Sequence, residues 1–197
     1  MKPFQERFEE YQFSVSGLSS LADDSFLHWQ KNYLDEKSTL QVSDFLPGKI
    51  YSIDYNDRLE KNKKFINKRP VIFFMGFFNY QDKMVFGGLD LILIPPQYRL
   101  AFFIRISSVY ESQISTNIER VKKGDALDQV QLKCDYTTLE LIMKGIPWKN
   151  SYRAWDLQKI KDAKEITYED WTRIVYLHTR SIEGTPIEEI YKKNSLA

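Results

Sequence analysis

A double proline, Pro95-Pro96, separates two apolar runs and constrains the fold more than any other feature of the chain. The run before it, 84–94, is predicted to be a β-strand. Proline fixes φ and suits the first position of a helix, so the run after it is predicted to be a buried helix over 97–113. The alternative is a strand over 100–106, because this segment contains β-branched residues, which favour strands. The helix predicts burial of Phe102, Phe103 and Ile104.

Two more strand-like runs precede this segment, 50–55 and 71–78. The second is continuously apolar, which predicts a strand covered on both faces. The short connector 79–83 predicts a hairpin between the second run and 84–94. Gly87-Gly88 indicates a bulge or bend in that hairpin. Together these runs predict a small antiparallel sheet over 48–94, which can curl into an SH3-like barrel.

Helix signals lie on both sides of the predicted sheet, so the fold class is predicted to be α+β. Apolar spacing predicts helices within 3–13 and 18–34. We therefore expect an N-terminal helical arm over 1–46 and an α+β core over 47–197. Within that core the last third is predicted to be helical, from a short helix over 137–144 and two helix-start patterns. These patterns begin at Thr167 and at Thr185, the second being a capping box with Pro186 at the first helical position.

The predicted arm carries more aromatic surface than a single short helical layer should leave bare. Burial against a neighbouring subunit and folding back onto the arm's own sheet both remain open. The residues of this candidate assembly arm are Phe4, Phe8, Tyr11, Phe26 and Trp29.

Charge and composition limit the classes of partner. The 197 residues include 28 Lys and Arg against 27 Asp and Glu, so net charge gives no long-range attraction to nucleic acid or to anionic membrane. Aromatic residues make up 15% of the chain, which suits cores and permanent interfaces. Cys134 is the only cysteine, so no internal disulfide is expected. No apolar run approaches the roughly 20 residues of a bilayer span, and no signal peptide is recognised.

One segment departs strongly from charge balance. Between positions 58 and 69 there are six basic residues and only one acidic residue, Glu60. Such a segment can bind phosphate, with Phe65 as a stacking face, or can contact an acidic neighbouring subunit. The candidate contact residues are Arg58, Lys61, Lys63, Lys64, Lys68 and Arg69.

No motif predicts catalysis. The two histidines, His28 and His178, are too few for a zinc site and have no nucleophile motif beside them. Asp54, Asp57 and Asp90 are not followed by the Glu-x-Lys pattern of nucleases, and the glycines lack the spacing of a phosphate loop. We therefore expect a non-enzymatic protein with no catalytic, cofactor or metal site.

Several motifs resemble a virion protein family of large tailed bacteriophages. The family order is Pro-Gly-Lys-apolar-Tyr, an Asp-containing loop, an Arg-Pro-apolar strand, and Gly-x-Asn-x-His-Tyr-x-Pro-Pro-x-x-Arg. A basic, aromatic segment and an apolar segment ending in Trp follow, and the spacing is kept over most of 47–171. The matching segments are 47–51, 55–57, 69–72, 88–99, 152–155 and 166–171.

The chain departs from the signature at three positions. Asp90, Ile92 and Leu93 stand where the family has Asn, His and Tyr. A change from polar to apolar side chains in a strand points to packing rather than to chemistry.

The resemblance implies a structural subunit of the phage particle, in the tail, baseplate or neck, that contacts other virion proteins. Its alternative is a DNA-binding protein that acts on DNA ends or packaging through the basic segment 58–69. Both place the chain in the virion, assembled in the host cytoplasm, with no membrane partner.

Overall fold

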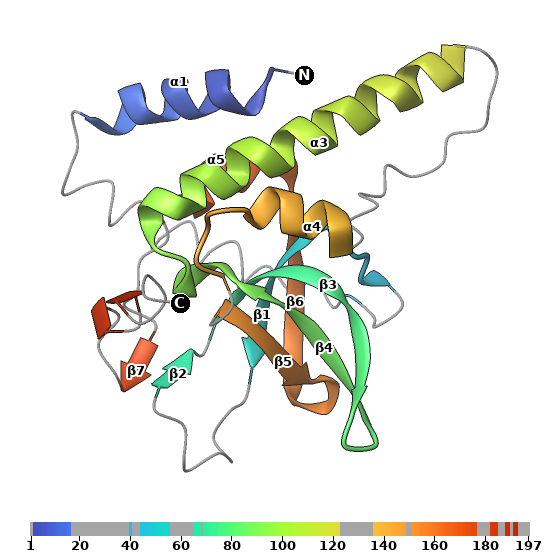
Figure 1. Cartoon of the computed structure of the whole chain (residues 1–197), viewed down its shortest axis with the longest axis vertical. Helices are drawn as coiled ribbons and strands as arrows, with labels where there is room; N and C mark the ends of the chain where they lie inside the picture. The colour runs from blue at the N-terminus through green and yellow to red at the C-terminus, as the bar shows by residue number, and fades with distance from the viewer. Residues whose placement is uncertain are drawn as a thin grey trace.

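A five-stranded antiparallel sheet with helices packed on one face forms the body of the protein (Figure 1). The computed structural model describes residues 2–16, 40, 44–55, 65–67, 69–122, 136–148, 151–176, 182–184, 188–189 and 191–192. The strand order is β5-β4-β3-β1-β6, and β2 and β7 form a separate two-stranded sheet. The strands are β1 (Ile50–Tyr55), β2 (Phe65–Asn67), β3 (Val71–Tyr80), β4 (Lys83–Asp90), β5 (Tyr152–Asp156), β6 (Ile160–Ile166) and β7 (Ile182–Gly184).

The larger sheet is curled. Its two edge strands, β5 and β6, are joined only by the three-residue 3₁₀ helix η4 (Leu157–Lys159). That link spans at most roughly 14 Å, whereas four strand spacings in a flat sheet cover about 19 Å. No pairing of β5 with β6 occurs among the described residues, so the sheet stays open. The α+β prediction is confirmed, but the sheet does not close into a barrel.

Because the sheet is curled, each face of β3 packs against an apolar cluster. Val71 and Phe73 point to the helices, whereas Ile72 and Phe74 point into the curl. All four side chains are buried, which confirms the prediction of a strand covered on both faces. The inside of the curl is packed with aromatic rings and short apolar side chains: Phe45, Tyr51, Ile53, Tyr55, Ile72, Phe74, Phe86, Trp155 and Ala163.

The predicted hairpin is confirmed, and its turn is shorter than expected. β3 and β4 are joined by Gln81-Asp82, whose φ angles of 48° and 59° define a two-residue turn of the primed type. The predicted irregularity is present as a register shift between Phe74 and Gly76, which lies in β3 opposite Gly87 and Gly88. The hairpin tip points away from the helical layer (Figure 1).

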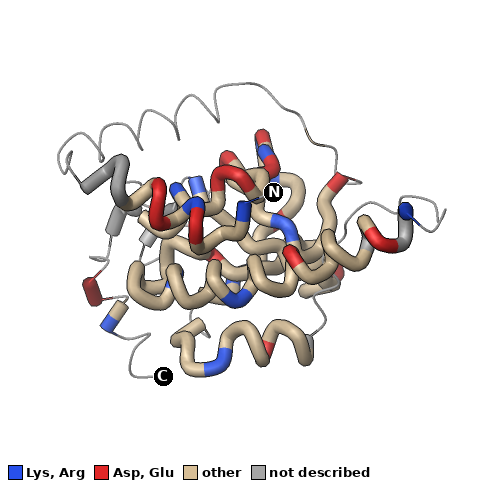
Figure 2. The backbone as a smooth tube through the Cα atoms, turned by 90° about the horizontal axis from the view of Figure 1, so that it is seen from above, with Lys and Arg blue, Asp and Glu red and all other residues tan. Residues whose placement is uncertain are grey.

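The helical layer is built around α3 (Pro96–Lys122), which begins at the second proline as predicted and runs further than 113. Seen from above, α3 lies between α1 (Phe4–Ser16) and α4 (Tyr136–Met143) (Figure 2). Phe102 and Phe103 are fully buried under α3. The prediction for Ile104 is wrong: its side chain is 42% exposed, because only one face of the helix packs on the sheet.

Helix α1 folds back on its own chain. Phe4 and Phe8 are buried, and Phe4 stacks on Phe103 of α3 with ring centroids 5.9 Å apart. The amide of Phe4 donates to Glu111 Oε1 at 2.8 Å, and the hydroxyl of Tyr168 donates to the same oxygen. This burial removes Phe4 and Phe8 from the predicted assembly surface. Tyr11 is half-buried beside Tyr176, and Phe26 and Trp29 lie outside the described residues.

Two predictions of secondary structure are wrong. The strand expected over 84–94 ends at Asp90, and 91–93 form the 3₁₀ helix η2 (Leu91–Leu93) because the Asp90 carboxylate accepts from the amide of Ile92. The C-terminal third is not mainly helical, since it supplies β5 and β6 to the sheet before a short α5 (Trp171–Ile174). The helix start at Thr167 is present as η5 (Tyr168–Asp170), and the Thr185 capping box lies outside the described residues. In the described ranges no helix has the length and apolar character needed to cross a membrane.

Candidate nucleic-acid interface

The segment that resembles the phage signature builds the corner between β4 and α3. At Gly88 an added Cβ would lie 2.4 Å from the carbonyl oxygen of Phe73, so glycine allows the close approach of β3 to β4. Asp90 caps η2, and Pro96 starts α3. The signature residues therefore shape the backbone and are not gathered on a surface.

Arg99, the last residue of the signature, is fully buried in this corner. Its guanidinium donates to the carbonyl oxygens of Ile94 at 2.6 Å, Ile92 at 3.3 Å and Val175 at 3.3 Å. It also donates to the hydroxyl of Tyr191 at 2.6 Å. Burial lowers the pKa of the Arg99 guanidinium, whereas Tyr191 and the Asp90 carboxylate act in the opposite direction. Arg99 thus joins the corner to the C-terminal segment and is not available to DNA.

The basic segment 58–69 connects β1 to β3 through β2. Arg69 is half-buried at the point where the chain enters β3. The other predicted contact residues lie outside the described residues: Arg58, Lys61, Lys63, Lys64 and Lys68. The segment therefore leaves and re-enters the sheet at the end where β1 stops and β3 starts.

The strand register places further lysines beside the start of this segment. Tyr55, at the end of β1, pairs with Ile160, which is flanked by the half-buried Lys159 and the exposed Lys161. These lysines are about a hundred residues away in sequence, so only the pairing of β1 with β6 reveals their position. Asp54 and Asp162 face each other one step along the same pair, so two carboxylates lie beside the two lysines and balance their formal charge.

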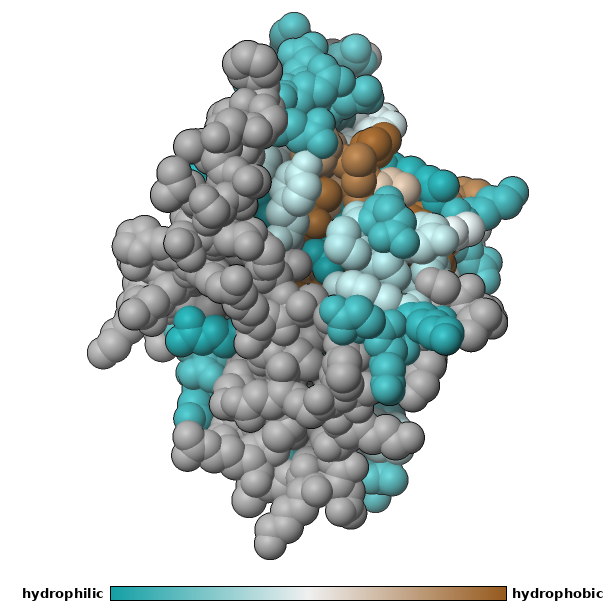
Figure 3. All heavy atoms as spheres, turned by 90° about the vertical axis from the view of Figure 1, so that its left-hand side faces the viewer, coloured by the Kyte–Doolittle hydropathy of each residue, from teal (hydrophilic) through white to brown (hydrophobic). Residues whose placement is uncertain are grey.

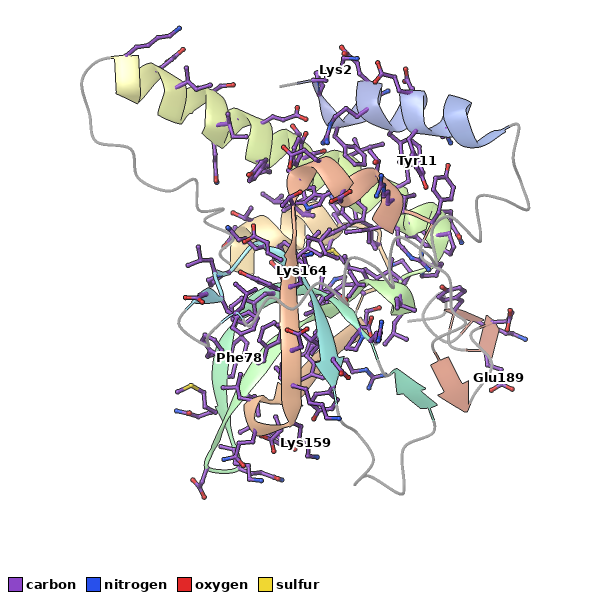
Figure 4. The ribbon with its side chains drawn as sticks, turned by 180° about the vertical axis from the view of Figure 1, so that it is seen from behind. Lys2, Tyr11, Phe78, Lys159, Lys164 and Glu189 are labelled. Carbon is purple, nitrogen blue, oxygen red and sulfur yellow. The ribbon has the colours of Figure 1, made fainter. Side chains whose placement is uncertain are left out.

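A second feature that sequence patterns missed lies on the hairpin. Phe78, Tyr80 and Tyr152 are 42%, 61% and 37% exposed. Phe78 and Tyr80 alternate along β3, and the Phe78 and Tyr152 rings meet edge to face with centroids 6.4 Å apart. Figure 4 shows Phe78 on the sheet, well below Lys2 and Tyr11 of α1. We call these three residues the ring platform.

The helical layer has a different exposed apolar surface. Figure 3 shows a small apolar area on this layer, bordered by polar residues. The large hydrophobic residues exposed on the layer are mainly aliphatic: Ile104, Ile118, Leu141 and Tyr176. Single exposed apolar residues of this kind are normal on a protein surface.

Within the ranges that the structure describes, no three His, Cys, Asp or Glu side chains are grouped so as to hold a metal ion. The described features define an α+β protein with a basic connection at one end of its sheet and exposed rings on its hairpin. Residues 15–188 match the family model described as phage T4 terminal DNA protecting protein. The chain therefore belongs to that family. No curated protein and no solved structure gave a match.

The match confirms a phage family, as the sequence resemblance implied. It gives no support to a position in the tail, baseplate or neck. Of the two predicted functions, the alternative that acts on DNA ends agrees better with the description of the family.

Proposed function

We propose that the chain binds the ends of phage DNA and shields them from degradation. The observation that carries this proposal is the family match over residues 15–188, whose description names terminal DNA as what the family's protein protects. The proposal replaces the tail, baseplate or neck subunit expected from the sequence. It also agrees with the burial of Phe4 and Phe8 in their own chain, which removes part of the surface on which that expectation rested.

The basic segment 58–69 supplies the phosphate contacts in this proposal. Lys and Arg that neutralise phosphates release condensed counterions and so favour binding to any DNA sequence. The local excess of positive charge exceeds the net charge of +1 for the whole chain, so we expect the phosphate contacts to come from this segment. Lys159 and Lys161 lie beside the start of the segment and can add phosphate contacts.

Protection by binding needs no chemical step. A protein that occupies the last base pairs denies an exonuclease the end at which it loads. We therefore propose a non-enzymatic role, in the phage particle or in the infected cell, with DNA as the main partner and other virion proteins as further partners.

Exonuclease protection tests this function. The full chain is mixed with a linear duplex and, separately, with a duplex of the same sequence whose ends are closed by hairpin loops. We expect saturating protein to slow digestion of the linear duplex at least tenfold, and to bind it more tightly than the closed duplex. Unchanged digestion at saturation, together with equal affinity for the two duplexes, contradicts the proposal.

A matched pair of variants separates a phosphate role of the basic segment from a general charge effect. Lys61→Gln, Lys63→Gln and Lys64→Gln together are expected to weaken protection. Lys2→Gln, Lys122→Gln and Lys144→Gln remove the same charge from exposed positions on the helical layer and should leave protection intact.

A further inference from the structure

Phosphate contacts alone do not explain how a protein distinguishes a DNA end from the middle of a duplex. Phosphates repeat along the whole duplex, and contacts to them carry no information on position. What an end has and the interior lacks is a base whose outer face is not covered by a neighbouring base. A surface that binds the flat face of a base therefore lets a protein distinguish an end, in addition to any contact with the terminal phosphate or hydroxyl group.

We propose that the ring platform, Phe78, Tyr80 and Tyr152, stacks on the terminal base of a DNA end. This inference rests on the proposed function and names the part of the DNA that the hairpin recognises. Stacking on aromatic side chains is independent of sequence, because every base has an aromatic face.

The backbone beneath the platform holds the Phe78 ring in place. A Cβ added at Gly87 would lie 2.4 Å from Cε2 of Phe78 and 2.9 Å from the hydroxyl oxygen of Tyr152. Glycine at this position therefore lets the ring lie against the strand backbone, with Tyr152 against its edge. The ring is held from below and from one side, yet 42% of the residue stays open to solvent.

The location of the platform leaves room for a ligand. Val71 and Phe73 point to the helical layer, and the register shift between Phe74 and Gly76 reverses the alternation of β3. Beyond it Phe77 points into the curl, so Phe78 and Tyr80 lie on the same side of the sheet as the helices. The hairpin, however, extends beyond that layer (Figure 1). The helices therefore bury the start of the strand and leave its end uncovered.

A lysine lies at the edge of the platform. Lys83 pairs with Tyr80 across the hairpin, and its side chain is 66% exposed. It forms an ion pair with the Asp156 carboxylate, which lies 3.7 Å away and is 18% exposed. The Lys83 ammonium is thus open to solvent beside the rings, although it shares this edge with the carboxylates of Asp82 and Asp156. A base stacked on the rings would bring its own phosphate towards this cation.

Fluorescence of 2-aminopurine tests the platform. The probe is a linear duplex with 2-aminopurine as the terminal base, compared with the same duplex carrying it in the middle. Stacking quenches this fluorophore, so we expect the full chain to quench the terminal probe and to leave the central probe unchanged.

Variants then assign the quenching to the rings. Phe78→Leu with Tyr80→Leu keeps apolar side chains but removes the aromatic faces. We expect it to abolish quenching of the terminal probe and to weaken binding of the linear duplex about tenfold, within the range of one stacked base. Affinity for the hairpin-closed duplex and its salt dependence should not change. Ile104→Ala, at a residue of equal exposure on the helical layer, should change none of these values.

The outcomes separate the two proposals. If the unmodified chain binds linear and closed duplexes equally and does not quench the terminal probe, the proposed function fails and this inference fails with it. If the unmodified chain prefers ends but the ring variant keeps that preference and the quenching, only the platform inference is overturned. A ring variant that binds ends normally but no longer enters phage particles would assign the rings to a protein partner, and would likewise overturn the inference.

Discussion

At the scale of single residues, the buried Arg99 shows why the signature segment is structural. Its side chain supplies donors to three carbonyl oxygens and one hydroxyl that are otherwise covered by the corner. Lysine has a compact ammonium group and cannot reproduce the planar set of donors of arginine. We expect Arg99→Lys to lower the free energy of unfolding by about 3 kcal/mol, as measured by urea denaturation.

The control for this prediction is Arg105→Lys. Arg105 is exposed and also donates to backbone carbonyls, those of Ile142 and Lys144, so its replacement should cost under about 1 kcal/mol. The folded fraction of Arg99→Lys should bind linear DNA as the unmodified chain does. Weakened DNA binding at unchanged stability would instead place Arg99 in the interface.

Gly88 gives a second prediction at this scale. An added Cβ would meet β3, with the backbone carbonyl oxygen of Phe73 at 2.4 Å and the side-chain Cγ2 of Ile72 at 2.6 Å. We expect Gly88→Ala to force the strands apart and to cost more than about 3 kcal/mol in thermal or urea unfolding. Gly145→Ala is the control. Its φ of +74° strains an alanine by about 1–2 kcal/mol, but nothing lies near the added atom. Equal losses for the two variants would contradict this account of Gly88.

At the scale of elements, α3 carries one buried face and one open face in adjacent residues. Phe103 contacts Phe4, Phe102 and Trp171 with ring centroids within 6 Å, so it joins α1 and α5 to the centre of the layer. We expect Phe103→Ala to cost on the order of 3–5 kcal/mol in urea unfolding. Ile104→Ala, one residue further along, should cost under about 1 kcal/mol. A loss below about 1 kcal/mol for Phe103→Ala would show that α3 is not held by this face.

The elements also show what the sequence could and could not predict. Strands β1 and β3 and helices α3 and α4 were predicted because their apolar patterns reflect burial along the element itself. Strands β5 and β6 were missed because they are sheet edges with exposed and charged positions, such as Arg153 and Lys161. They are held by pairing with β4 and β1, which lie more than sixty residues away in the chain. A local pattern cannot contain that information.

The candidate site likewise has one part that the sequence predicted and one part that only the structure revealed. The basic segment 58–69 is continuous in sequence, so composition alone identified it. The ring platform combines two residues of β3 with one of β5, over a glycine of β4. Phe78 was predicted to end a buried strand and Tyr80 to lie in the connector 79–83, and only the limited extent of the helical layer shows that their rings are exposed side by side on the hairpin. The rings are exposed because the hairpin is longer than the helical layer that covers its start, and a local sequence pattern does not contain these relative lengths.

At the scale of the whole molecule, the net charge is only +1, whereas the segment 58–69 is strongly basic. Phosphate contacts should come from that segment and its neighbours rather than from the protein as a whole. The logarithm of the binding constant for B-DNA falls with the logarithm of salt concentration, with a slope of about −0.9 for each phosphate neutralised. The slope therefore counts contacts independently of the affinity itself.

We expect the variant Lys61→Gln, Lys63→Gln and Lys64→Gln to reduce the magnitude of this slope by about 2.7 if each lysine neutralises one phosphate. Fluorescence anisotropy with a labelled linear duplex over a salt series gives the value. The helical-layer variant Lys2→Gln, Lys122→Gln and Lys144→Gln has the same net charge, so it should keep the original slope. If both variants lower the slope equally, overall charge drives binding and the basic segment has no particular role. If neither lowers it, the phosphates are contacted elsewhere, and Lys159 and Lys161 beside β1 become the next residues to neutralise.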